Sequence, residues 1–168
     1  MESFPISPRQ FTWIWCSGVV LGFAGAAILR RAQRLPFFRP HFPNVEILQT
    51  WQSGASSIGL MGTLARANNC LWFALTADTL HVGAHFPFNM FIPRFIAGLD
   101  LTIPVATITS VSQRTAFMRT EYVHVEYEVA DPTMGTMRTE YVDLSPRGDR
   151  FFNILDEKVR RTRGRRAI

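Results

Sequence analysis

Residues 70–82 read CLWFALTADTLHV and decide the fold of the larger part of this chain. Cys70 to Thr76 is a short, continuous apolar run, which is typical of a strand buried on both faces. Ala77–Asp78 has the composition of a turn, and Thr79 to His85 then alternates apolar residues with polar or small ones. This stretch therefore predicts a two-stranded hairpin inside a β domain.

Further strands are predicted on both sides of this hairpin. The sequence MRTEYV occurs twice, at residues 118–123 and 137–142, and we interpret the two copies as neighbouring strands joined by a turn at Asp131–Gly135. If Val123 and Val142 both face the core, odd-numbered residues of one strand must pair with even-numbered residues of the other, because a one-residue slip turns every side chain over. The other predicted strands are residues 58–65, 99–104, 106–111, 121–129 and 139–144.

The segments that flank these strands predict a loop and a helix. Ser53 to Ser57 (SGASS) reads as a loop, because glycine and serine are typical turn residues. Residues 147–163 predict a helix, since Phe151, Phe152, Leu155 and Val159 form an apolar stripe at helical spacing. Together the elements predict a mainly β fold, a small antiparallel barrel or sandwich with a C-terminal amphipathic helix.

This pattern resembles the pleckstrin-homology/GRAM-like superfold. The resemblance is carried by Leu71–Val82, by the I-P-x-x-x-I step at Ile103–Ile108, by a V-x-V-x-Y strand and by the final helix, and it covers roughly residues 52–160. The segments SGASS, GTLARANNCL, FPFNMF and IP also resemble uncharacterised bacterial membrane-anchored proteins of this type. The resemblance implies a PH-like binding module and no particular activity, because its motifs are structural. Phosphoinositide-binding members carry several basic residues in the first hairpin loop, where this chain has only Arg66.

The N-terminal part predicts a membrane anchor. Phe11 to Leu29, FTWIWCSGVVLGFAGAAIL, has no charge and no proline. Nineteen residues make about 28 Å of helix, close to the hydrocarbon thickness of a bilayer. A cleaved signal peptide is the alternative, but the preceding residues carry no net charge and the apolar run is long for one.

Basic residues give the predicted anchor an orientation. They follow the helix and are nearly absent before it, which places the β domain in the cytoplasm beneath the cell (inner) membrane. The last twelve residues carry six basic side chains and one acidic side chain, which equals the whole net charge of +5, so the remainder of the chain is neutral. The predicted organisation is a short extracytoplasmic N-terminus (1–10), a transmembrane helix (11–30), a Pro/Phe-rich spacer (31–50), the PH-like domain (51–160) and a basic tail (161–168).

No pattern in the sequence predicts a catalytic, cofactor or metal site. His81 and His85 lie on a predicted strand, where four residues span roughly 13 Å, too far for one ion. Gly54 to Ile58 lacks the final glycine of a hydrolase nucleophile elbow. We therefore expect no enzyme, and we expect no nucleic-acid partner because the basic tail is short and lacks aromatic residues.

Three surfaces are candidates for binding. Residues 86–96, FPFNMFIPRFI, either fold back over an open end of the barrel or contact the membrane or a partner, through Phe86, Phe88, Met90, Phe91, Ile92 and Phe95. Anionic lipid is the expected ligand of the arginines that flank the helix and fill the tail: Arg30, Arg31, Arg34, Arg160, Arg161, Arg163, Arg165 and Arg166. Gly18, Gly22 and Ala26 recur every four residues, a spacing that lets two membrane helices approach closely.

The sequence therefore favours a non-catalytic, single-pass membrane protein whose PH-like domain engages a protein partner or the inner leaflet. The alternative is a structural subunit of a membrane complex, or a homo-oligomer, that acts mainly through packing of its transmembrane helix.

Overall fold

The computed structural model describes residues 7–32, 38–57, 67–91, 100–115, 121–131 and 134–166. It divides into two compact units, residues 1–37 and 38–168. The first unit contains α1 (Pro8–Ala32), which is the one helix in the described part of the chain that is long and apolar enough to cross a membrane; its span Arg9–Ala32 has a mean hydropathy of 1.7.

Helix α1 begins three residues before the predicted apolar span. Ser7 explains this start, because its hydroxyl accepts a hydrogen bond from the backbone N–H of Gln10 while the Gln10 side chain accepts one from the N–H of Ser7. This reciprocal arrangement is a capping box, and Pro8 in the first helical position needs no donor there. Arg30 and Arg31 lie in the last turn of the helix.

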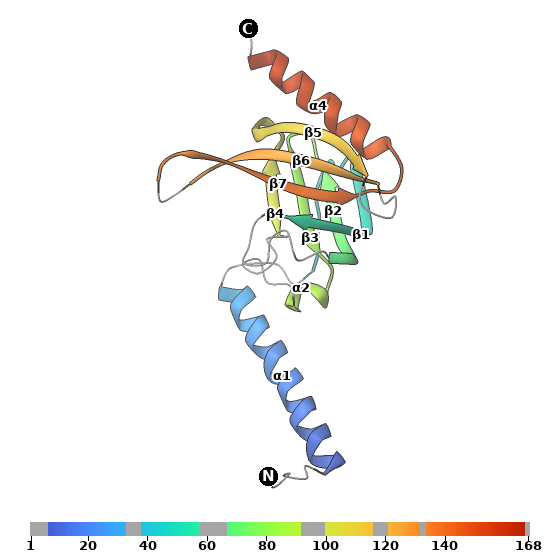
Figure 1. Ribbon diagram of the computed structural model, residues 1–168, viewed down its shortest axis with the longest axis vertical. Coiled ribbons are helices and arrows are strands. Elements are labelled where there is room, and N and C mark those ends of the chain that lie inside the picture. Colours follow the sequence, from blue (N-terminus) through green and yellow to red (C-terminus); the bar gives the residue numbers. More distant parts are fainter. Residues whose placement is uncertain are drawn as a thin grey trace. The chain divides into compact units, whose positions relative to one another are not determined.

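The second unit is mainly β, as predicted. Its seven strands form one antiparallel sheet in the order β4-β3-β2-β1-β7-β6-β5 (Figure 1). Among its described residues, this unit has two α-helices, the short α2 (Phe88–Phe91) and α4 (Arg150–Arg166), and a 3₁₀ turn, η2 (Val105–Thr107), separates β4 from β5. The strands are β1 (Ile47–Ser56), β2 (Ala67–Leu75), β3 (Thr79–Ala84), β4 (Leu101–Pro104), β5 (Ile108–Thr115), β6 (Glu121–Ala130) and β7 (Met137–Ser145).

The sheet is curled but not closed. Strands β4 and β5 are its two edges, and no hydrogen-bonded ladder joins them among the described residues. Only the three residues of η2 connect them, a length of about 10 Å, so the two edges must meet at that corner. Figure 1 accordingly shows β5, β6 and β7 running across the direction of β2, β3 and β4. The sheet therefore does not close into the predicted barrel.

Strand β1 joins the two halves of the sheet. Its first half pairs with β2, and its second half pairs with β7 from Ser53 to Ser56. The predicted loop SGASS is thus wrong, because it forms the second half of this strand. A side chain on Gly54 would place its Cβ 2.7 Å from the carbonyl oxygen of Asp143, so this glycine permits close approach of β1 and β7.

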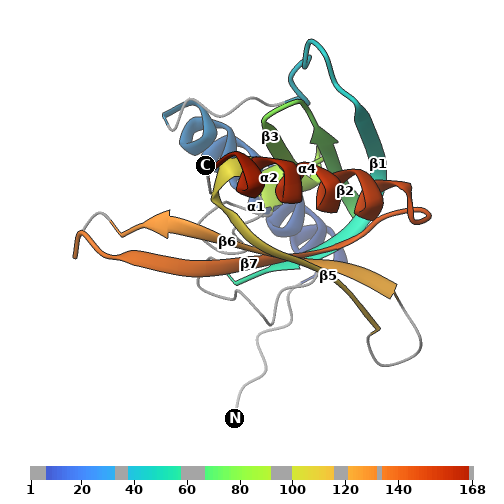
Figure 2. The same ribbon diagram turned by 90° about the horizontal axis from the view of Figure 1, so that it is seen from above.

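The core lies between the two halves of the curled sheet and is covered by α4. Phe151, Leu155 and Val159 of α4 are buried in it, and the Phe151 ring packs 4.8 Å from the ring of Phe73 in β2. Figure 2 shows α4 lying across the sheet. This confirms the predicted apolar stripe of the C-terminal helix.

The register of the β6–β7 hairpin confirms the prediction from the repeated MRTEYV. Val123 pairs with Leu144, Val125 pairs with Val142, and both valines and their partners are buried. Odd-numbered residues thus join even-numbered ones. The turn is closed by two backbone hydrogen bonds, from the N–H of Asp131 to the carbonyl of Thr136 and from the N–H of Gly135 to the carbonyl of Asp131. The predicted strand 58–65 lies outside the described residues, and the predicted strand 106–111 starts at Ile108 because η2 precedes it.

Candidate functional site

The predicted apolar loop begins at the end of β3 and presents aromatic rings to the surface. Phe86 is 46% exposed and Phe88 is 41% exposed, whereas Asn89 beside them is buried. The side chains of Met90 and Phe91, and all of Ile92 and Phe95, lie outside the described residues. The two described phenylalanines of this loop are therefore available for contact.

Two aromatic residues from other segments of the chain lie next to this loop. The Trp51 ring stacks on His85 at 4.5 Å and is 50% exposed, and the Phe38 ring lies 5.4 Å from that of Phe86. We call the exposed side chains Phe38, Trp51, Phe86 and Phe88 the aromatic patch. Periodicity could not have revealed it, because its members come from three segments distant in the sequence.

The described part of the Pro/Phe-rich spacer packs on the outer face of the sheet. Phe42 stacks on His81 at 4.3 Å and lies 5.6 Å from the ring of Trp72. At the end of the spacer the backbone N–H of Glu46 donates to the carbonyl of Leu75. Residues 38–46 therefore belong with the β domain. Because Phe42 covers Trp72, strand β2 is buried on its outer face as well as on its core face.

The two histidines of β3 and its end occupy partly buried aromatic surroundings. Burial lowers the pKa of His81. Burial also lowers the pKa of His85, and the positive charge of Arg39 lowers it further. The hydroxyl of Thr102 is the polar neighbour of His81, at 3.4 Å from Nδ1. Both imidazoles are thus favoured as neutral, stacked rings.

This arrangement predicts a loss of stability on acidification. The folded-state pKa of each histidine lies below the ordinary 6.5, so the unfolded chain binds more protons, and stability falls as the pH drops through and below about 6.5. The free energy of unfolding, measured by urea denaturation in detergent between neutral and acidic pH, should fall less steeply for His81→Gln/His85→Gln than for the natural chain. Equal slopes would contradict this assignment.

The basic tail continues α4 and is partly neutralised within it. Arg160 pairs with Asp156 at 2.9 Å and Arg161 pairs with Glu157 at 2.5 Å, both one helical turn apart. Arg163 is exposed, and the side chains of Arg165 and Arg166 lie outside the described residues. Exposed pairs of this kind contribute little free energy.

A polar cluster on the outer face of β6 and β7 surrounds His124. Its Nδ1 lies 2.6 Å from Asp143 and its Nε2 lies 3.2 Å from Glu126, an arrangement that a doubly protonated imidazole satisfies by donating twice. Ser112 pairs with His124 in the sheet, but its hydroxyl is buried and His124 is already occupied on both nitrogens. The line of Ser112, His124 and Asp143 therefore does not form an activated nucleophile.

Glu140 is a buried carboxylate on the β6–β7 hairpin. It is only 6% exposed and pairs across the hairpin with the buried Tyr127, on the core side. Arg138 donates to one of its carboxylate oxygens, and the other oxygen has no hydrogen-bond partner. Alternation from the inward-facing Val142 places Glu140 on this same face, so its position follows from the register of the hairpin.

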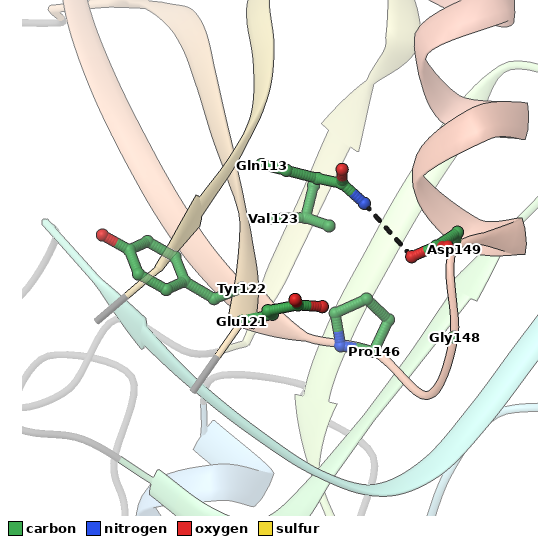
Figure 3. Close-up of a pocket in the computed structure, with 7 residues that line it drawn as sticks. All are labelled: Gln113, Glu121, Tyr122, Val123, Pro146, Gly148 and Asp149. Atoms are coloured by element: carbon green, nitrogen blue, oxygen red, sulfur yellow. Dashed lines mark hydrogen bonds between the residues drawn. The ribbon is translucent and has the colours of Figure 1, made fainter. Parts of the chain in front are cut away.

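A small open pocket lies where β5, β6 and the loop that precedes α4 meet. Figure 3 shows Gln113 donating to Asp149 across it, at 3.4 Å, with the Glu121 carboxylate directed toward Pro146 and the Tyr122 ring directed away. Tyr122, Val123 and Gly148 complete its lining. Its polar groups are an amide and two exposed carboxylates, without a nucleophile or a base held beside one.

Neither metal-ligand geometry nor comparison with known proteins assigns a function to the described residues. Within the described ranges, no group of three or more His, Cys, Asp and Glu side chains is arranged to hold a metal ion. Cys16 and Cys70 are free thiols, and burial raises the pKa of Cys70. A comparison with protein-family models finds no match, and neither does a comparison with curated proteins.

Proposed function

We propose that this chain is a single-pass membrane protein whose PH-like β domain is a non-catalytic binding module, engaging the inner leaflet beside its own anchor or a protein partner there. The observation that carries the proposal is the exposure of Phe86 and Phe88 on a domain that follows an apolar helix of membrane-spanning length. Exposed aromatic clusters usually mark an interaction site.

The fold supports the PH-like part of this proposal. Seven antiparallel strands followed by a C-terminal helix are what the resemblance implies, and the stretch Leu71–Val82 occupies the adjacent strands β2 and β3, neither of which is an edge of the sheet. The orientation, with the domain in the cytoplasm of the cell (inner) membrane, rests on the arginines after α1. The exposed Arg31 at the end of α1 and the exposed Arg163 of α4 add electrostatic attraction to anionic lipid, whereas Arg30 is only 5% exposed.

The proposal predicts that Phe86 and Phe88 contribute to lipid contact more than to the stability of the β domain. In the full chain reconstituted in phosphatidylglycerol-containing vesicles, Phe86→Ser/Phe88→Ser should reduce photo-crosslinking of lipid to the β domain several-fold. The urea midpoint should change little, because both rings are already two-fifths or more exposed. Met134→Ser, at an exposed residue of the β6–β7 turn, is the matched control. Collapse of stability in the double variant would instead show that the rings cover the core.

The structural-subunit alternative has one observation in its favour. A Cβ at Gly18 or Gly22 would have no heavy atom within 4 Å, so this side of α1 is open to close packing by a second helix. In the same vesicles, Gly18→Leu/Gly22→Leu should abolish energy transfer between donor- and acceptor-labelled copies if helix packing is the main activity. Loss of energy transfer with unchanged lipid crosslinking would favour this alternative over the leaflet proposal.

A further inference from the structure

Trp51 has a backbone conformation that is unusual for its size. Its φ is +58°, in the left-handed region that large side chains rarely adopt. It is the extra residue of a β-bulge, because Thr50 pairs with Trp72 and Gln52 pairs with the next residue, Leu71. The bulge lets β1 bend from β2 toward β7, but the bend needs only a residue tolerant of positive φ, such as Gly or Asn. The bend therefore does not explain why the residue is tryptophan.

The bulge directs the Trp51 ring outward onto a firm support. The ring lies nearly parallel to His85, with an angle of 14° between their planes. His85 is held by backbone hydrogen bonds at both ends, from its N–H to Cys70 and from the N–H of Asn89 to its carbonyl. Trp51 remains 50% exposed although its ring stacks on His85. Strained residues that persist on a rigid frame are commonly functional.

Other exposed aromatic residues lie near the residue that supports Trp51. His85 is followed in the chain by Phe86, whose ring contacts Phe38, and Phe88 opens helix α2. Phe38 is 70% exposed. Arg39 lies close enough to His85 to affect its charge. Tryptophan, phenylalanine and arginine side by side form the set of residues that is enriched where protein meets the headgroup layer of a bilayer.

The chain itself brings this surface close to a membrane. Helix α1 ends at Ala32 and Phe38 is six residues later, which can span at most roughly 20 Å. If α1 spans a bilayer, Phe38 lies no farther than this distance from the point where α1 leaves the membrane. The ring of Phe86 in turn contacts Phe38. A membrane surface is then always within reach of the patch, whereas a protein partner would have to be recruited.

We propose that the aromatic patch inserts into the interfacial layer of the bilayer that α1 spans, with Trp51 as its central ring and Arg39 beside it at the lipid phosphates. This inference rests on the proposed function and deepens it, since it names the surface and the ligand as phospholipid at headgroup depth. The bulge at Trp51 is the device that presents the ring.

The test follows the fluorescence of Trp51 in the full chain. The protein is reconstituted in phosphatidylcholine–phosphatidylglycerol vesicles that contain lipid brominated near the headgroup end of its acyl chains, and each spectrum is compared with that of Trp51→Phe. The difference reports Trp51 without disturbing Trp13, Trp15 or Trp72. We expect at least half of this difference signal to be quenched by the brominated lipid and little of it by aqueous iodide. Strong iodide quenching without bromine quenching would overturn the inference.

A second variant separates lipid contact from folding. Trp51→Gly suits the positive φ, so the urea midpoint should stay unchanged or rise, while lipid photo-crosslinking to Phe86 and Phe88 should fall several-fold. If the domain still crosslinks to lipid as strongly, the inference fails and the proposed function stands. If neither Trp51→Gly nor Phe86→Ser/Phe88→Ser changes lipid photo-crosslinking, this inference fails, and so does the binding of the inner leaflet in the proposed function.

Discussion

Replacing Phe151 by alanine is expected to lower the free energy of unfolding of the β domain by about 3–5 kcal/mol, because a fully buried aromatic side chain is removed and a cavity remains. Phe151 connects α4 with the sheet, where its ring meets that of Phe73. Domains of this size have total stabilities of roughly 5–15 kcal/mol, so a third or more could be lost. Urea denaturation of the detergent-solubilised chain, followed by circular dichroism, measures the effect.

The adjacent residue supplies a matched control for this prediction. Phe152 belongs to the same helix and is the same residue type, but it is only partly buried against the core. Phe152→Ala should cost well under half as much, since the transfer free energy scales with the area removed from water. Equal losses for the two variants would mean that α4 does not dock through the face that carries Phe151.

Replacing Gly54 by alanine should give the second-largest effect, a loss of about 1–3 kcal/mol, because overpacking forces the surroundings to move. The new Cβ would lie 2.7 Å from the carbonyl oxygen of Asp143 and 2.9 Å from a methyl group of Leu71. The carbonyl belongs to the neighbouring strand β7, which pairs with β1 at Gly54 and Leu144, so it cannot move without weakening the ladder. The methyl group could rotate, but the backbone oxygen could not.

A glycine without neighbours is the control for this substitution. Gly164 lies in α4 with nothing within 4 Å of a Cβ position, so Gly164→Ala should be neutral or stabilising by up to about 1 kcal/mol through helix propensity alone. Urea midpoints of both variants are compared under one detergent condition. A tolerated Gly54→Ala would show that β1 and β7 are farther apart than this sheet requires.

In the proposed binding mode, the arginines of α4 and the aromatic patch contribute to lipid binding in different ways. Attraction by arginines weakens with salt over a Debye length of about 10 Å, whereas aromatic insertion does not. Because Arg160 and Arg161 are already paired within α4, we expect the aromatic patch to supply the contact that persists at high salt. The same crosslinking measurement at raised salt distinguishes the two contributions.

Local pattern was enough to predict the elements whose two faces differ. Leu71 to Leu75 is buried throughout as a continuous apolar run requires, and the repeat MRTEYV yielded the register of β6 and β7 because valines on one face must stay inside. The apolar length of α1 was also readable, because charge and proline are excluded from such a helix. In each case the information lies within one stretch of sequence.

Three features depended on neighbours far away in the chain. SGASS looked like a loop because glycine serves turns and close strand contacts alike, and only β7 beside Gly54 distinguishes them. Glu140 lies on the face of Val142 by alternation, but its burial comes from the opposing strand, where Tyr127 pairs with it. Trp51 lay outside the predicted strands, and only the pairing of β1 with β2 shows it as the extra residue of a bulge.

By itself, then, the sequence determined an apolar helix, a mainly β domain and the inward face of its main hairpin, since hydrophobic periodicity is a local property. Tertiary structure alone decided that the sheet stays open at β4 and β5, that β1 bends at a bulge, and that Phe38, Trp51 and Phe86 form one surface. The physical reason is that strand pairing and ring contacts join residues separated by tens of positions, whose proximity no local pattern encodes.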